Sequence, residues 1–170
     1  MSRIRYAVIG STGMIGGVHI DAIRKLENAE LVAVATRSAG PVGAQAASLG
    51  VKPYTSVDAL LADREVDAVT VATPHPSHLA IIVKAAQAGK HILTDKPMGV
   101  TVSEADEMVR ATQEAGVTFG VIYNNRFRPE CQKAKGILDG GLLGNLYRTH
   151  MVHATIRSQA YFDETKWRGK

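Results

Sequence analysis

Three glycines with the spacing GxxGxxG follow the first apolar segment of the chain. Gly10, Gly13 and Gly16 come directly after the apolar residues 4–9 and open a helical pattern. Glycine permits a positive φ and a close approach of the backbone to a ligand, while the first turn of a helix offers free N–H groups to an anion. The spacing therefore predicts a turn that binds the diphosphate of a dinucleotide. A strand-to-helix turn without a ligand and the related turn of a methyltransferase are the alternatives.

A polar segment follows the second apolar run. Thr36, Arg37 and Ser38 stand where an acidic residue would bond the ribose 2′-hydroxyl of NAD and repel the 2′-phosphate of NADP. A guanidinium pairs with phosphate through two hydrogen bonds, and both hydroxyls can donate to it. The segment favours NADP(H). NAD(H) stays possible, because Arg37 is also compatible with a solvated loop arginine.

A lysine follows the fourth apolar run, and two histidines follow the third. Lys96 belongs to the sequence TDKP, and His75 and His78 belong to the segment 72–78. Ligands of an open parallel sheet bind at the carboxyl ends of its strands. Partial burial and a nearby acid would tune the pKa of Lys96, so that it binds a substrate hydroxyl and helps to move its proton. The alternatives are a surface lysine in a turn and two solvated histidines beside a helix start.

The elements that must position these residues alternate between apolar strands and amphipathic helices. Strands are predicted at 4–9, 31–36, 67–73, 91–95 and 117–122. Single helices connect them, which implies right-handed crossovers and a parallel sheet. The predicted caps of three of these helices are Ser56, Ser77 and a capping box formed by Ser103 and Asp106. The chain is thus an α/β protein with a doubly wound parallel sheet, the Rossmann fold, over about residues 1–122.

The remaining residues, 123–170, show a different pattern. A helix is predicted over about 129–138, and a longer strand with partial alternation over 146–156. A strand without neighbours invites disorder or pairing with another chain, and we expect one of these after about residue 140. The single cysteine, Cys131, is expected to pack within the fold.

Composition excludes several classes of function. The 170 residues carry a formal net charge of +4, with few aromatic residues and mostly scattered basic ones, which argues against nucleic acid. The six histidines show neither HxxxH nor HExxH spacing, so no metal site is expected. No apolar stretch approaches the roughly 20 residues of a membrane span, and the N-terminal apolar run is too short for a signal peptide. One cysteine also fits a reducing compartment, so a cytoplasmic protein is expected.

Beyond these patterns, the sequence resembles the Gfo/Idh/MocA family of NAD(P)-dependent oxidoreductases. The similarity runs through essentially the whole chain, in order, in the segments AVIGSTGMIGGVH, LVAVATRS, DAVTVATPHPSH, AGKHILTDKPMGVT, NRFRP and LGNLYR. The resemblance implies hydride transfer at the nicotinamide C4, with a sugar, an inositol or a related polyol, or its keto form, as substrate. Lys96 matches the lysine of the family's (E/D)KP motif, which implies that Lys96 is catalytic.

The resemblance also implies the residues that contact the cofactor. They lie in the glycine turn, at the ends of the following strands, and in the last third of the chain: Gly10, Ser11, Thr12, Gly13, Met14, Ile15, Thr36, Arg37, Ser38, Ala72, Thr73, Pro74, His75, His78, Asp95, Lys96, Pro97, Asn124, Arg126, Trp167 and Arg168. Two departures from the family's pattern are local. The turn is GxxGxxG where GxGxxG is usual, with Ser11 in the place of a glycine, and Asp95 is one methylene shorter than the commoner glutamate.

The third departure is length. Members of the family are roughly twice as long, within the usual range of two domains. Their second domain supplies the substrate contacts, a DxxxH-type motif with the acid/base histidine, and the interface of a homo-oligomer. The resemblance thus implies that residues 123–170 are a connecting helix and the beginning of a truncated substrate domain, and that the fragment alone is inactive.

Other readings of the sequence stay open or are disfavoured. A non-catalytic NADP(H)-binding or regulatory protein is the main alternative. A dihydrodipicolinate reductase-like enzyme has no natural place for the DKP and NRFRP segments. A short-chain dehydrogenase would need a YxxxK pair, and no tyrosine here has a lysine four residues later.

Overall fold

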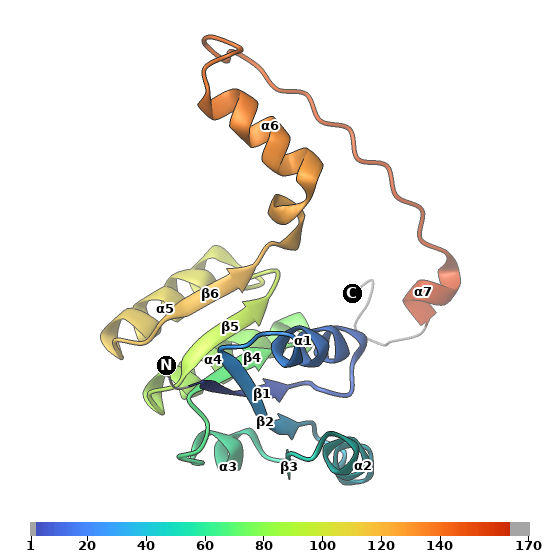
Figure 1. Ribbon diagram of the computed structural model, residues 1–170, viewed down its shortest axis with the longest axis vertical. Helices are drawn as coiled ribbons and strands as arrows, with labels where there is room; N and C mark the ends of the chain where they lie inside the picture. The colour runs from blue at the N-terminus through green and yellow to red at the C-terminus, as the bar shows by residue number, and fades with distance from the viewer. Residues whose placement is uncertain (1–2, 164–170) are drawn as a thin grey trace. The chain divides into compact units, whose positions relative to one another are not determined.

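The computed structural model describes residues 3–163 and separates the chain into two compact units. The first unit ends at Tyr123 and the second begins at Asn124. The first contains a parallel β-sheet with helices on both faces, and the second contains short helices and extended chain (Figure 1). Each unit is described by itself.

The sheet of the first unit has six strands in the order β3-β2-β1-β4-β5-β6, and all neighbouring strands are parallel. The chain moves outward from β1 in one direction through β2 and β3, and in the other through β4, β5 and β6. A doubly wound sheet of this order places its ligand crevice between β1 and β4, outside their carboxyl ends. The strands are β1 (Ile4–Ile9), β2 (Ala29–Ala35), β3 (Lys52–Tyr54), β4 (Ala68–Val71), β5 (His91–Asp95) and β6 (Phe119–Ile122). This arrangement confirms the predicted Rossmann fold.

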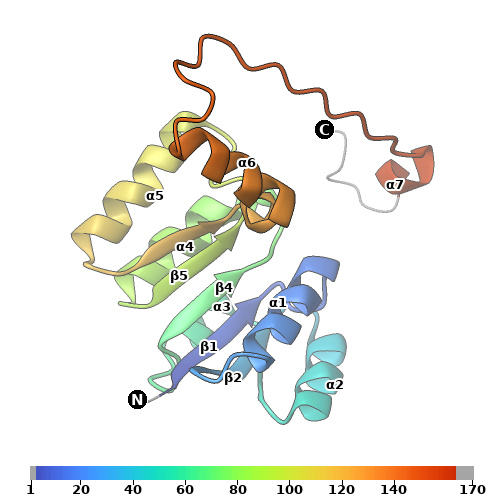
Figure 2. The ribbon, with the colours of Figure 1, turned by 45° about the horizontal axis from the view of Figure 1, so that its top comes forward.

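Helices cover both faces of the sheet, as Figures 1 and 2 show from two directions. They are α1 (Met14–Arg24), α2 (Ala39–Leu49), α3 (Val57–Leu61), α4 (His78–Gln87) and α5 (Val102–Glu114), with the 3-10 helix η1 (His75–Ser77) before α4. Helices α1 and α2 pack on one face, and α3, α4 and α5 on the other. Each helix follows a strand, so every crossover returns the chain to the same end of the sheet.

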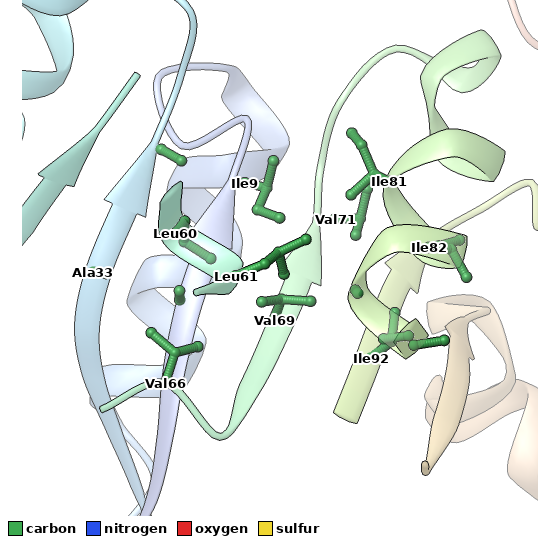
Figure 3. Packing of buried hydrophobic residues seen from close by; sticks show 14 of the residues in the cluster. Ile9, Ala33, Leu60, Leu61, Val66, Val69, Val71, Ile81, Ile82 and Ile92 are labelled. Carbon is green, nitrogen blue, oxygen red and sulfur yellow. The ribbon is translucent and has the colours of Figure 1, made fainter. Parts of the chain in front are cut away.

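The core is divided by the sheet into two apolar clusters. Side chains alternate along a strand, so Ala7 and Ile9 of β1 join one cluster while Val8 joins the other. Figure 3 shows the larger cluster, to which Leu61 of α3, Val69 of β4, and Ile82 of α4 contribute. Because these clusters hold the strand ends rigidly, the loops that follow the strands have defined positions.

Among the elements of the first unit, an edge strand and a helix cap differ most from the sequence-based expectations. The edge strand β3 was not predicted, because it has three residues, one of them Pro53, and its pattern is neither apolar nor alternating. The start of α5 was predicted two residues too late. Thr101, not Ser103, caps this helix, and its hydroxyl accepts a hydrogen bond from the N–H of Glu104. The cap at Ser56 is confirmed, since its hydroxyl accepts from the N–H of Ala59.

The second unit contains the 3-10 helix η2 (Asn124–Phe127) and the helices α6 (Pro129–Asp139) and α7 (Gln159–Asp163). The helix predicted over about 129–138 is thus confirmed, but the strand predicted over 146–156 is wrong. These residues are exposed and have no regular secondary structure, since a strand needs a neighbour and the described part of this unit provides none. Cys131 is exposed on α6, so the packing role expected for it is not found.

Candidate cofactor site

The glycine turn lies at the carboxyl end of β1, is hydrogen-bonded to the end of β2 and lies close to the end of β4. The N–H groups of Gly10 and Ser11 donate to the carbonyl of Ala35, at the end of β2, over 2.8 and 3.2 Å. Gly10 has a φ of 86°, and a Cβ at this position would lie 2.6 Å from the carbonyl oxygen of Ala72, just after β4. Only glycine fits this position, because both the backbone conformation and the close approach exclude a side chain.

The other two glycines serve the start of α1. A Cβ on Gly16 would lie 2.3 Å from the carbonyl oxygen of Gly10, so glycine lets the helix pack directly against the turn. A Cβ on Gly13 would meet only that same oxygen, at 3.4 Å. Gly13 is the N-cap of α1 and makes no side-chain cap, and the first turn of the helix contains no acidic residue. The N–H groups at the start of this 11-residue helix are therefore available to an anion.

Side-chain hydrogen bonds join the turn to the segment after β2. Gln45 of α2 donates from Nε2 to the carbonyl of Ser11 over 3.1 Å, and the hydroxyls of Thr12 and Thr36 are 3.3 Å apart. Arg37 and Ser38 are exposed at the same strand end. The segment 36–38 was predicted to decide between NAD and NADP. It thus begins beside the glycine turn, which was predicted to bind the diphosphate.

The segment after β4 is fixed by its own side chains. The hydroxyl of Ser77 lies 2.8 Å from that of Thr73 and donates to the carbonyl of Pro74 over 2.7 Å. Ser77 occupies the N-cap position of α4, as predicted, but its hydroxyl makes no cap hydrogen bond because it serves these loop partners. Burial lowers the pKa of His75, and the charges of His78 and Lys96 lower it further, while Asp95 opposes them.

His78 is fully buried, which the sequence did not reveal. Its Nε2 lies 2.9 Å from the carbonyl oxygen of Thr73, and its Nδ1 lies 3.1 Å from that of Pro97. The alternative of a solvated histidine is therefore excluded for His78. The ring joins the segment after β4 to the segment after β5.

The lysine segment follows β5. The Lys96–Pro97 peptide bond is cis, and the Lys96 side chain is exposed, so the partial burial expected for it is not found. Asp95 is half-buried beside it. An exposed ammonium group at this strand end can donate to an oxygen of a bound molecule.

A buried histidine that the sequence analysis missed lies on α1. His19 Nδ1 is 3.1 Å from the Thr70 hydroxyl of β4, and burial lowers the pKa of His19 while the charge of Asp95 opposes this. His19 stands three residues after Gly16, on the face that also buries Ile20 and Ile23. That spacing is the signal that would have placed it in the core.

Most of the predicted site residues therefore lie at one edge of the sheet. The segments 10–15, 36–38, 72–78 and 95–97 follow the carboxyl ends of β1, β2, β4 and β5. Asn124 and Arg126 belong to η2 of the second unit. Trp167 and Arg168 lie outside the described residues.

Within residues 3–163, no helix is both long and apolar enough to cross a membrane. The same residues contain no cluster of three His, Cys, Asp or Glu side chains suited to a metal ion.

A sequence profile for an oxidoreductase family with an NAD-binding Rossmann fold matches residues 4–123. This match covers most of the chain. The chain belongs to the Gfo/Idh/MocA oxidoreductase family. The resemblance stated from the sequence segments is thereby confirmed, and the matched residues coincide with the unit that carries the glycine turn and Lys96.

Relatives in the Gfo/Idh/MocA family include catabolic proteins and dehydrogenases. The rhizopine catabolism protein MocA of Rhizobium meliloti is 34% identical over 150 residues, which are 86% of this chain and 46% of that protein. The myo-inositol 2-dehydrogenase of Thermotoga maritima is 29% identical over 158 residues, which are 92% of this chain and 46% of that protein. The chain thus spans about half the length of the curated relatives it matches.

A solved structure in the Gfo/Idh/MocA family is similar over nearly the whole chain. The WlbA dehydrogenase from Bordetella pertussis, solved in complex with NADH and UDP-GlcNAcA, superposes with a TM-score of 0.88 at 32% identity. The superposition covers 98% of this chain and 51% of that one.

Proposed function

We propose that this chain is the cofactor-binding half of an NAD(P)-dependent dehydrogenase or reductase that acts on a sugar, an inositol or a related polyol, or its keto form. The observation that carries the proposal is the uncapped start of α1 beneath a turn where glycine alone fits at positions 10 and 16. That arrangement leaves backbone N–H groups and a positive helix end facing the place of a diphosphate. The dehydrogenases among the relatives support the substrate class.

The cofactor, when bound, accepts or supplies a hydride at its nicotinamide C4. In the oxidation direction, the hydride leaves the C–H bond of a carbinol and the hydroxyl proton passes to a base. Lys96, exposed at the end of β5, would donate a hydrogen bond to the reacting oxygen and stabilise the charge that grows on it. The base that takes the proton is proposed to lie in the second domain, of which residues 123–170 would be the connecting helix and the beginning. The 170 residues alone are therefore expected to bind the cofactor but not to turn over substrate.

NADP(H) is the proposed cofactor, with NAD(H) as the competing choice. Arg37 is exposed beside Thr36 and Ser38, and these residues contain no carboxylate to repel a 2′-phosphate. The guanidinium of Arg37 can form two hydrogen bonds with the 2′-phosphate of NADP(H). The 2′-hydroxyl of NAD(H) carries no charge with which the guanidinium could pair.

The test is a pair of titrations of the chain with NADPH and NADH, repeated on Arg37→Glu. Wild-type protein is expected to bind NADPH about tenfold more tightly than NADH, a difference of about 1.4 kcal/mol. The Arg37→Glu variant is expected to reverse this order. Equal or tighter NADH binding by the wild type would overturn the proposed preference, and failure to bind either dinucleotide would overturn the proposed function.

A further inference from the structure

His78 is a buried polar side chain to which the proposed function assigns no role. It is the first residue of α4 and is fully shielded from solvent. One ring nitrogen faces the carbonyl oxygen of Thr73 at 2.9 Å, and the other faces that of Pro97 at 3.1 Å. These carbonyls belong to the two loops that follow β4 and β5. A single ring therefore spans the loops at the edge where the cofactor is proposed to bind.

Each contact is a hydrogen bond only when the facing ring nitrogen carries a proton, because a carbonyl oxygen only accepts. A neutral ring has one N–H, which donates either from Nδ1 to Pro97 or from Nε2 to Thr73, whereas a protonated ring donates to both. The Thr94 hydroxyl lies 3.4 Å from Nδ1. Among the hydrogen bonds of the described residues, the bond from His78 to Pro97 is the one that reaches the backbone of residues 96–98.

We infer that His78 is a positioning residue for Lys96, which it holds in place by donating from Nδ1 to the carbonyl of Pro97. Lys96 is exposed and precedes Pro97 directly, so its ammonium group depends on this turn for its location. Without the donor, the partly buried carbonyl of Pro97 would lose its hydrogen-bond partner and the turn would become more mobile. The inference rests on the catalytic role proposed for Lys96, but the hold on the turn can be measured independently of that role.

Amide side chains separate the two ring contacts. The amide nitrogen of asparagine is two bonds from Cβ, as Nδ1 of histidine is, and that of glutamine is three bonds away, as Nε2 is. His78→Asn therefore keeps a donor for Pro97, and His78→Gln keeps one for Thr73. His78→Phe keeps a ring but no donor. His150→Asn, at an exposed position in the second unit, is the matched control.

The experiment measures backbone ¹⁵N relaxation order parameters in the whole 170-residue chain, together with the rate at which an N-hydroxysuccinimide ester acylates Lys96 relative to Lys84. In His78→Gln and His78→Phe, the order parameters of Lys96 and Met98 are expected to fall from about 0.85 to below about 0.6, and the relative acylation rate of Lys96 is expected to change. In His78→Asn, both order parameters are expected to stay near about 0.85, as in the wild type. Amides of β1 and the His150→Asn control should not change.

Equal order parameters at Lys96 and Met98 in the Asn and Gln variants, whether high or low, would overturn the inference, because the ring would then act by packing alone. If His78→Phe fails to fold, the comparison of Asn with Gln still decides. The proposed function fails on a different result, the absence of NADPH binding by the wild type. The order parameters of Lys96 and Met98 are measured without any dinucleotide, so the two failures are distinguishable.

Discussion

At the scale of single residues, the glycine turn restricts most strictly which amino acid fits at its positions. Gly16 and Gly17 are adjacent on α1, yet their surroundings are opposite. A Cβ on Gly16 would collide with the Gly10 carbonyl at 2.3 Å, whereas a Cβ on Gly17 would have no heavy atom within 4 Å. The pair offers a test in which the same substitution is made one residue apart.

Gly16→Ala is expected to destabilise the chain by about 1–3 kcal/mol, because α1 must move away from the turn. It should also weaken NADPH binding about tenfold or more, since the turn and the helix start would no longer share one geometry. Gly17→Ala should stabilise the chain by about 0.5–1 kcal/mol, the difference in helix propensity, and leave binding unchanged. Urea denaturation and NADPH titration measure both effects. Equal tolerance of the two alanines would refute the packing described for the turn.

At the scale of elements, an ion pair joins β1 to the chain that enters β4. Arg5 donates from Nε and Nη2 to the two carboxylate oxygens of Asp67, over 2.9 and 2.7 Å. The hydrogen bonds from the guanidinium lower the pKa of Asp67 from 3.8 to about 2. A carboxyl group with a lowered pKa in the folded state stabilises the fold above its unfolded pKa, and this contribution is lost as the pH falls through the folded value.

The stability difference between wild type and Asp67→Asn is therefore expected to be largest near neutral pH and to shrink between about pH 4 and pH 2. Urea denaturation at several pH values measures it. The comparison variant is Asp58→Asn, which removes a more exposed carboxylate that pairs with Lys84. A difference for Asp67→Asn that stays constant down to pH 2 would contradict the lowered pKa.

The cap of α5 gives a second test at this scale. Thr101 accepts from the N–H of Glu104, and the Glu104 carboxylate accepts from the N–H of Val100 over 2.7 Å. Thr101→Ala is expected to cost about 1 kcal/mol of unfolding free energy. Ser103→Ala, inside the helix, should be neutral or slightly stabilising. Thermal or urea denaturation distinguishes the two variants. A larger loss of unfolding free energy in Ser103→Ala than in Thr101→Ala would indicate that Ser103 caps the helix, as the sequence predicted.

The elements also show what the sequence can predict. The strands at 4–9 and 91–95 were predicted to the residue, because each is a short segment that contains adjacent apolar residues and is followed directly by Gly10 or Lys96. The short edge strand β3 was missed, and a strand was expected over 146–156 where the structure has none. The local sequence pattern shows which face of a segment is apolar. Whether the segment forms a strand also depends on a neighbouring strand that lies elsewhere in the chain.

For the candidate site, the place of each residue in the fold was easier to predict than the burial of its side chain. The loops after β1, β2, β4 and β5 follow from the topology alone, because parallel strands bring their carboxyl ends to one edge. The burial of His78 could not be predicted, since it depends on a contact with Pro97, 19 residues away. The exposure of Lys96 was missed for the same reason, as burial is set by tertiary contacts rather than by neighbours in sequence.

At the scale of the whole molecule, the second unit carries apolar side chains that nothing in its described part covers. Leu146, Tyr147, Met151 and Ile156 are all more than half exposed. The chain spans about half the length of the relatives it matches, such as the rhizopine protein. We propose that these side chains are buried when the remainder of a substrate domain is present.

In the 170-residue chain, amides 146–156 are expected to exchange with solvent at nearly unprotected rates, since they belong to no helix or strand. The amides of β1 and β4 should be strongly protected and serve as the internal reference. Mass-spectrometric hydrogen exchange gives both values in one experiment. Strong protection of 146–156 in a monomer would show that this segment has found a partner within the chain.

The central claim is that a dinucleotide binds across the carboxyl edge of the sheet, with its diphosphate at the start of α1. An NMR titration of ¹⁵N-labelled protein with NADPH tests this most directly. The amides of residues 10–15, 36–38, 72, 73 and 75 are expected to shift together and saturably, while those of α3 and β3 stay in place. Shifts confined to other surfaces, or none at millimolar NADPH in a well-folded sample, would contradict the account.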